Sequence, residues 1–224
     1  MPHTVMNAKR NAKQNVKIPD NIRTVIFDLD GTIYDKRGLA RRMVRRLWWC
    51  LPLLAAERVA RRTMHNREFG SEQDFYEAFF SQMARGHWWT DRIAEKWYHH
   101  VYLPSMVHLI AKHCKPRAEV LSIIDNTDRD TVTMAIYSDY GCVDGKLLAL
   151  GIDPSLFSLR LDAPSTGALK PARTSVEKVM KALSADPETT LFIGDRDDKD
   201  GVSARLVGAY YLILQNTGCT EIRH

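Results

Sequence analysis

Short apolar runs alternate with stretches of helical spacing along most of the chain. Val25, Ile26 and Phe27 form an uninterrupted β-branched and aromatic run, which predicts a strand buried on both faces of a sheet. Further strands are predicted over residues 131–137, 158–161, 190–193 and 209–214, and helices over residues 117–125, 143–150, 174–183 and 202–207. This alternation predicts an α/β fold with a Rossmann-like, mainly parallel sheet and helices on both faces.

Residues 36–115 follow a different pattern, because strand-like runs disappear after Asp35. Helical spacing predicts helices over residues 39–51, 52–63, 71–85, 88–102 and 105–115, with Gly70, Gly86 and Pro104 between them. Ser71 and Asp74 resemble a capping box, and Phe75, Phe79 and Met83 recur at helical spacing. We predict a helical cap over residues 36–115, inserted after the first strand of a core formed by residues 22–35 and 116–224.

The ends, the cysteines and the length narrow the class of protein. With 224 residues, 45% of them hydrophobic, the chain is long enough for one core and a smaller domain. Residues 1–21 are predicted to be a mobile basic tail without the apolar region of a secretory signal. No apolar run approaches the ~18 residues of a membrane span. Cys50, Cys114, Cys142 and Cys219 show no paired spacing, so we expect reduced thiols and a cytoplasmic protein.

The positive charge of the chain is concentrated in one segment of the predicted cap. Residues 36–62 contain nine basic residues and one acid, Glu57, a balance of +8 against +5 for the whole chain. Arg41 and Arg45 lie one helical turn apart, as do Arg42 and Arg46. The opposite side of this helix carries an apolar row formed by Ala40, Val44, Leu47 and Leu51. Three interpretations are open: a solvated basic face with its apolar side in the cap core, arginines on the inner face that attract an anionic substrate, or adhesion to an anionic membrane or nucleic acid through Trp48 and Trp49.

Polar residues follow several of the predicted strands at the point where each strand ends. Asp28 and Asp30 come directly after the first strand, although an Asp-x-Asp-Gly-Thr run alone also fits an ordinary turn. Ser138 and Asp139 end the second strand, Lys170 lies in a later loop, and an acidic run over 194–200 follows the fourth. Because the carboxyl ends of parallel strands meet at one edge of a sheet, we expect these side chains to converge. A hydroxyl, an ammonium group and several carboxylates are the groups that a phosphoryl group and a hard cation need.

With these four motifs in order, the chain from Thr24 to Leu214 resembles the haloacid dehalogenase superfamily, whose phosphohydrolases use an aspartate nucleophile. The resemblance implies that Asp28 attacks phosphorus and becomes an aspartyl phosphate, and that Asp30 protonates the leaving oxygen and later activates water. It implies phosphate contacts from Leu29, Asp30, Ser138, Asp139 and Lys170. It also implies a Mg²⁺ site formed by the Asp28 carboxylate, the Asp30 backbone carbonyl and Asp195.

The resemblance does not decide which acid orients the metal site, but it distinguishes phosphatases from other members of the superfamily. Asp200 has the spacing of the outer acid that orients the metal site, with Asp198 as the second choice, and either Asp197 or Asp198 is suited to cap the following helix. Tyr34 is a further candidate for contact with the leaving group. Family members that displace halide lack an acid where Asp30 stands, and the transport ATPases have Lys-Thr at residues 29 and 30.

The sequence therefore predicts a Mg²⁺-dependent phosphatase that acts on a small phosphorylated metabolite, as a monomer or homodimer and without an obligatory nucleic acid. A phosphomutase of the same superfamily would carry the same motifs and return the phosphoryl group to a bound sugar. A non-catalytic binding protein is the alternative from another class, and adhesion to an anionic surface through the arginine-rich segment is compatible with each of these functions.

Overall fold

A computed structural model of the chain describes residues 18–65, 67–214 and 222–223. Residues 1–17 of the predicted tail and Cys219 lie outside the described residues. None of the described helices has the length and apolar character that crossing a membrane requires. Cys50, Cys114 and Cys142 are all free thiols.

The core contains a six-stranded sheet in the order β3-β2-β1-β4-β5-β6. The strands are β1 (Thr24–Phe27), β2 (Thr133–Ser138), β3 (Leu159–Asp162), β4 (Thr190–Gly194), β5 (Tyr210–Ile213) and β6 (Ile222–Arg223). Pairs among β1 to β5 are parallel, whereas β6 is antiparallel to β5. The predicted mainly parallel α/β fold is confirmed; β6, with two residues, is too short for a sequence pattern to reveal.

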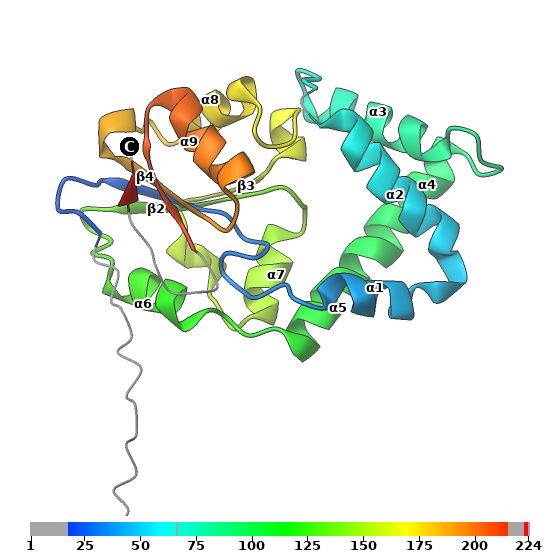
Figure 1. The fold of residues 1–224 in the computed structure, drawn as a ribbon, viewed down its shortest axis with the longest axis horizontal. Coiled ribbons are helices and arrows are strands. Elements are labelled where there is room, and N and C mark those ends of the chain that lie inside the picture. The colour runs from blue at the N-terminus through cyan, green and yellow to red at the C-terminus, as the bar shows by residue number, and fades with distance from the viewer. Residues whose placement is uncertain (1–17, 66, 215–221, 224) are drawn as a thin grey trace, which may run out of the picture.

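Helices cover both faces of this sheet (Figure 1). From β1 the chain moves outward through β2 to β3, and it then returns past β1 to β4 and β5. Because parallel crossovers are right-handed, the two directions place their helices on opposite faces. Helices α6 (Ala118–Asn126) and α7 (Val143–Ala149) lie on one face, and α8 (Arg173–Ala182) and α9 (Val202–Val207) lie on the other. Strand β1, between β2 and β4, is thus the point where the strand order reverses.

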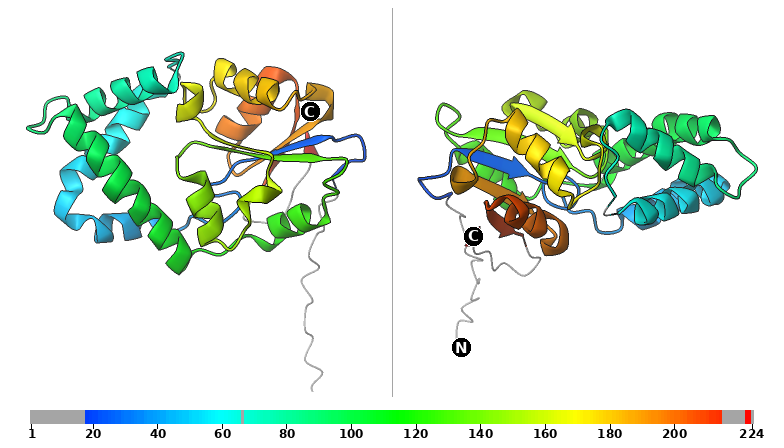
Figure 2. Two further views of the ribbon diagram at one scale, coloured as in Figure 1. Left: turned by 180° about the vertical axis from the view of Figure 1, so that it is seen from behind. Right: turned by 90° about the horizontal axis from the view of Figure 1, so that it is seen from above.

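Residues 39–113 form a helical insertion that extends from the carboxyl edge of the sheet (Figure 2). Its helices are α1 (Leu39–Arg46), α2 (Leu51–Met64), α3 (Glu72–Ala84), α4 (Asp91–Trp97) and α5 (Leu103–His113). The predicted cap at Ser71 is present, because the Ser71 hydroxyl accepts a hydrogen bond of 3.1 Å from the Asp74 N–H. Phe75, Phe79 and Met83 are all buried, as their spacing predicts.

Three boundaries within the insertion differ from the sequence prediction. The first helix ends at Arg46 rather than residue 51, and Trp48–Cys50 form a separate 3₁₀ turn. The helix expected from residue 88 begins at Asp91. The expected break at Pro104 is wrong, because a π-helical turn, Tyr98–Tyr102, joins α4 to α5 and Pro104 falls in the first turn of α5. Proline has no backbone N–H, and it lies here where the hydrogen-bond pattern changes from the π-helical to the α-helical one.

Candidate active site

Asp28 lies at the carboxyl end of β1 and is buried. Its N–H extends the sheet by donating to the Ile193 carbonyl at 2.8 Å, so the end of β1 is fixed against β4. One carboxylate oxygen accepts a hydrogen bond from the Thr32 hydroxyl at 2.9 Å, and the other accepts one from Lys170 Nζ at 2.8 Å. The strand and its two partners therefore hold the carboxylate in one orientation.

Lys170 forms a buried ion triad with two carboxylates. Its Nζ lies 2.8 Å from Asp28 Oδ1 and 2.9 Å from Asp200 Oδ1. Burial opposes its charge, but the two carboxylates hold the pKa of Lys170 well above its usual value. Burial also raises the pKa of Asp28, yet the charge and hydrogen bond of Lys170 outweigh it and leave that pKa below its usual value. Asp28 is therefore ionised at neutral pH, as a nucleophile needs to be.

Asp200 differs from Asp28 because burial dominates its titration. Burial raises the pKa of Asp200 to about 7, against the opposing charge of Lys170. The residue lies in a π-helical turn, Asp197–Gly201. Gly194 leaves room for it, because a Cβ at that position would stand 2.2 Å from Asp200 Oδ2. Asp198 lies outside this group, exposed and paired with Arg196.

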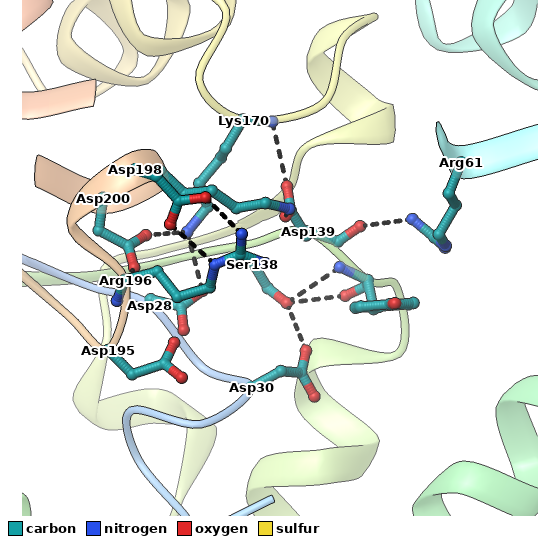
Figure 3. A network of polar contacts seen from close by, with 12 residues as sticks. Asp28, Asp30, Arg61, Ser138, Asp139, Lys170, Asp195, Arg196, Asp198 and Asp200 are labelled. Atoms are coloured by element: carbon teal, nitrogen blue, oxygen red, sulfur yellow. Dashed lines mark hydrogen bonds and ion pairs between the residues drawn. The ribbon is translucent and has the colours of Figure 1, made fainter. Parts of the chain in front are cut away.

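Three carboxylates of this edge are close enough to share a cation. Asp28, Asp195 and Asp200 each offer an oxygen, and these oxygens lie within 4.8 Å of one another. Figure 3 shows the three side chains grouped at the ends of β1 and β4. Carboxylate and carbonyl oxygens are the ligands that Mg²⁺ prefers, so the residues present fit this ion. The grouping includes Asp200, for which the sequence predicts only an outer position.

Lys36 places its own positive charge at this group of oxygens. Its Nζ lies 2.7 Å from the Asp30 carbonyl oxygen and 2.8 Å from Asp195 Oδ2. These are two of the three residues from which the sequence predicts a metal site. The oxygens therefore already attract a cation supplied by the chain.

Asp30 is held by a separate set of donors. Lys146 Nζ donates to Asp30 Oδ2 at 2.7 Å, and this lysine is fully buried. The Ser138 hydroxyl lies 2.9 Å from the same oxygen, and the Tyr34 hydroxyl donates to Asp30 Oδ1. The two neighbouring aspartates thus have different cationic partners, Lys170 for Asp28 and Lys146 for Asp30.

Ser138 and Asp139 connect β2 to the loop of Lys170. The Ser138 hydroxyl lies between Asp30 Oδ2 and the Tyr140 carbonyl oxygen, which is 3.0 Å away. Because the hydroxyl has one proton, it can donate a hydrogen bond to only one of these oxygens at a time. The Asp139 carboxylate accepts from the Lys170 N–H at 3.0 Å and is paired with Lys199. The side chain of Asp139 therefore fixes the backbone that carries Lys170.

Arg61, from α2 of the helical insertion, reaches this edge of the core (Figure 3). Its Nη1 donates to the Asp139 carbonyl oxygen at 3.1 Å, and its Nη2 donates to the Tyr98 hydroxyl at 2.8 Å. Its guanidinium carbon lies 3.8 Å from the centre of the Tyr140 ring. Burial opposes its charge, but Tyr98 and Glu57 hold the pKa of Arg61 above its usual value.

A cavity of about 720 Å³ extends from Asp30 between the core and helices α1 and α2. Arg58 and Arg62 line it, whereas the arginines of α1 do not. Val44 and Leu51, expected in the cap core, also line this cavity and are 41% and 45% exposed. Of the predicted apolar row only Leu47 is buried, and it does not line the cavity, whereas the neighbouring Leu39 and Met43 are buried and do line it.

The sequence prediction omits Lys36, Lys146 and Arg61 as individual site residues. Lys146 gives a signal in retrospect, because it shares one helical face with Val143, Leu147 and Leu150, which are apolar and buried. A lysine on such a face needs a partner with negative charge. Lys36 and Arg61 belong to a run of nine basic residues, and no feature of that run distinguishes these two.

The chain belongs to the haloacid dehalogenase-like hydrolase family, whose model matches residues 22–208. No curated protein sequence matches the chain. The structure is similar to CbbY from Rhodobacter sphaeroides, solved with phosphate, at 16% identity and a TM-score of 0.62, covering 88% of each chain.

Two further solved structures have a similar fold. A putative HAD-hydrolase, YfnB from Bacillus subtilis, was solved with magnesium; it is 17% identical, with a TM-score of 0.58 over 85% of this chain and 87% of its own. A 2-haloacid dehalogenase from Pseudomonas syringae pv. Tomato DC3000 is 17% identical, with a TM-score of 0.57 over 85% of each chain. At these identities the similarity concerns the fold, so the reaction of this chain must be argued from its own residues.

Proposed function

We propose that the protein is a Mg²⁺-dependent phosphatase that hydrolyses a small phosphomonoester through a phosphorylated Asp28. The observation that carries this proposal is the pair of carboxylates, Asp28 and Asp30, at one strand end and with separate cationic partners. A departing alkoxide needs a proton, whereas a departing halide does not. The presence of Asp30 beside the cavity therefore favours phosphate ester hydrolysis over dehalogenation.

In the first half of the proposed reaction, an oxygen of Asp28 attacks phosphorus and the bond to the leaving oxygen breaks. Lys170, 2.8 Å from Asp28 Oδ1, keeps the nucleophile ionised and offers positive charge to the phosphoryl oxygens. Asp30 gives its proton to the leaving oxygen. Ser138 offers a hydroxyl for a hydrogen bond to the transferring group.

In the second half, water attacks the phosphorylated Asp28 and Asp30 takes a proton from that water. Asp30 in the structure accepts hydrogen bonds from Lys146 and Tyr34, which suits the ionised carboxylate of a base. The proton that Asp30 takes from water in one turnover is the proton it gives to the leaving oxygen in the next. Phosphate is released and both carboxylates return to their starting states.

Mg²⁺, when bound by Asp28, Asp195, Asp200 and the Asp30 carbonyl, would neutralise part of the charge on the transferring phosphoryl group. The proximity of the three carboxylate oxygens and their attraction for the Lys36 ammonium support this assignment. Without a cation, the three carboxylates would repel both one another and the phosphate.

The proposal is tested by the Asp30→Asn variant with p-nitrophenyl phosphate. Because p-nitrophenolate leaves without a proton, Asp28 is still phosphorylated, but its hydrolysis lacks a base and slows by about 10²–10⁴-fold. We expect a burst of about one p-nitrophenol per protein followed by slow turnover. Stopped-flow absorbance measures the burst, and mass spectrometry of the quenched protein detects the phosphoryl group.

Asp28→Asn is the control, since it should give neither a burst nor added mass. Thermal unfolding of Asp30→Asn is measured in parallel, because the variant leaves buried Lys146 without its carboxylate. Steady-state turnover at the wild-type rate in Asp30→Asn would contradict the proposed role of this residue.

Lys36→Gln should bind Mg²⁺ more tightly than the wild type. The ammonium group competes for the Asp30 carbonyl and Asp195, and a partly exposed ion pair of this kind contributes up to about 1 kcal/mol, or fivefold in affinity. Titration calorimetry with Mg²⁺ measures the dissociation constant without substrate. The control is Lys112→Gln, on the exposed side of α5; an unchanged or weaker affinity in Lys36→Gln would show that Lys36 does not compete with the ion.

Two other functions remain to be tested beside the phosphatase. A phosphomutase would use the same residues and transfer the phosphoryl group from Asp28 to a bound sugar, so labelled phosphate would appear in a sugar product rather than in free phosphate. Adhesion to an anionic surface is favoured by Trp48 and Trp49, which are 71% and 60% exposed among the arginines of α1 and α2. Salt-sensitive sedimentation with phosphatidylserine vesicles would detect it.

A further inference from the structure

The cavity beside Asp30 has an apolar lining. Of its lining residues, five are charged: Asp30, Lys36, Glu57, Arg58 and Arg62. The rest are aliphatic residues, the methionines Met43 and Met106, and the tyrosines Tyr34, Tyr102 and Tyr140, and they come from both the core and the helical insertion. A volume of about 720 Å³ is in the range of pockets that hold small molecules.

The charged residues leave the middle of the cavity apolar. Asp30 and Lys36 belong to the catalytic edge described above. Glu57 is buried and forms an ion pair with Arg61 at 2.5 Å, so its charge is already matched. Arg58 and Arg62, on successive turns of α2, are exposed. Between these two ends, the polar side-chain atoms of the walls are the tyrosine hydroxyls, and that of Tyr34 already donates a hydrogen bond to Asp30.

The apolar wall is continuous with exposed apolar surface around it. Within the described part of the chain, eight large hydrophobic residues are exposed, and five of them belong to residues 44–59: Val44, Trp48, Trp49, Leu51 and Val59. Val44, Leu51 and Val59 line the cavity itself. Helices α1 and α2 therefore bury one apolar stripe in the insertion and leave a second stripe facing the cavity.

This lining discriminates between classes of phosphomonoester. A sugar phosphate would have to bury hydroxyl groups against aliphatic side chains, at a cost of about 1–3 kcal/mol for each unpaired hydroxyl. An alkyl or aromatic group would exchange water for apolar contact, which is favourable. The phosphoryl group must lie at Asp28, and the cavity begins at the neighbouring Asp30, so the leaving group occupies the cavity.

We propose that the substrate is a phosphomonoester of an apolar alcohol, whose alkyl or aryl group lies between α1, α2 and the core. The proposal rests on the phosphatase function and adds the chemical class of its leaving group. Met43, Leu54 and Met106 form the wall that contacts this group, and Arg58 and Arg62 attract the anionic ester toward the mouth.

The test is hydrolysis of n-alkyl phosphates from ethyl to octyl with Mg²⁺, each kept below its critical micelle concentration. Transfer of a methylene from water to an apolar wall favours binding by up to about fourfold, so we expect kcat/KM to rise by about two- to fourfold per methylene. Glucose 6-phosphate should be a poorer substrate than hexyl phosphate. Alkylphosphonates should inhibit competitively with the same dependence on chain length.

A matched pair of double variants locates the effect. Val44→Gln/Leu51→Gln changes two residues of the cavity, and Ile93→Gln/Leu148→Gln changes two exposed aliphatic residues outside it. The first should flatten the dependence on chain length, and the second should leave it as in the wild type. Circular dichroism and thermal unfolding establish that both variants are folded.

The outcomes separate this inference from the function on which it rests. Hydrolysis of ethyl phosphate and p-nitrophenyl phosphate without dependence on chain length, or a preference for glucose 6-phosphate, overturns the apolar leaving group and leaves the phosphatase in place. Failure to hydrolyse any of these esters, together with failure to form a phosphorylated Asp28, overturns both. If kcat/KM depends on chain length in Val44→Gln/Leu51→Gln as it does in the wild type, the assignment of the alkyl group to this cavity is overturned.

Discussion

Asp28→Asn is expected to lower phosphatase turnover by about 10⁴-fold or more, because the variant has no oxygen nucleophile to form the phosphorylated intermediate. The amide is nearly isosteric with the carboxylate and still accepts a hydrogen bond from Thr32, so the protein should fold. Steady-state release of phosphate from p-nitrophenyl phosphate measures the loss.

Asp198→Asn is the matched control for Asp28→Asn. Asp198 is an aspartate of the same edge, but it is exposed and contacts Arg196 rather than the carboxylate group of Asp28. We expect its variant to keep wild-type turnover, whereas Asp200→Asn, which changes the buried triad, should lose activity. Wild-type rates in a folded Asp28→Asn protein would remove the basis of the proposed reaction.

Lys170→Met is expected to have the largest effect on stability. The variant leaves Asp28 and Asp200 buried without their shared cation, which should lower the free energy of unfolding by about 3–5 kcal/mol. For a domain of this size the melting temperature should fall by roughly 10 °C. Differential scanning calorimetry measures the change, and Lys112→Met, an exposed substitution, should alter stability by less than about 0.5 kcal/mol.

The stability deficit of Lys170→Met should grow as the pH rises from 5 to 8. In the wild type the pKa of Asp28 is lowered, so Asp28 stabilises the fold above its unfolded pKa and loses that contribution as the pH falls through its folded value. Without Lys170, burial raises the pKa of both carboxyl groups, and folding then favours their neutral forms at low pH. Adding Asp200→Asn should restore stability, chiefly at pH 8. A deficit that does not depend on pH would contradict this account of the triad.

The convergence of distant residues was predictable because the topology of a parallel sheet fixes it. Asp28 and Asp195 directly follow β1 and β4, and Ser138 is the last residue of β2. These strands are neighbours in the sheet and run in one direction. Once the strands are recognised, the meeting of their carboxyl ends follows from the short, right-handed connections of such folds. The roles given to these residues remain proposals until the variants are measured.

The contacts made by long, flexible side chains were not predictable in the same way. Lys36 reaches the site from the loop before α1, and Arg61 reaches it from α2. Their positions depend on how α1 and α2 pack rather than on local spacing. The end of α1 at Arg46 has no glycine or proline in the three residues that follow it, where such a signal would stand. The apolar spacing of α1 indicated a buried stripe, but Val44 faces the cavity because sequence periodicity alone does not distinguish a protein interior from a pocket.

The hydrogen bond from Arg61 to the Asp139 carbonyl oxygen ties the helical insertion to the residue that follows Ser138. Any rotation of the insertion away from the sheet must exchange this bond for water, and bonds from a charged donor contribute about 1.5–3 kcal/mol. Because the Tyr140 N–H in turn donates to the Ser138 hydroxyl oxygen at 3.2 Å, such a rotation would act on the loop that positions this hydroxyl. In the proposed reaction, a rotation that releases the product would therefore also displace the hydroxyl proposed to bind the transferring phosphoryl group.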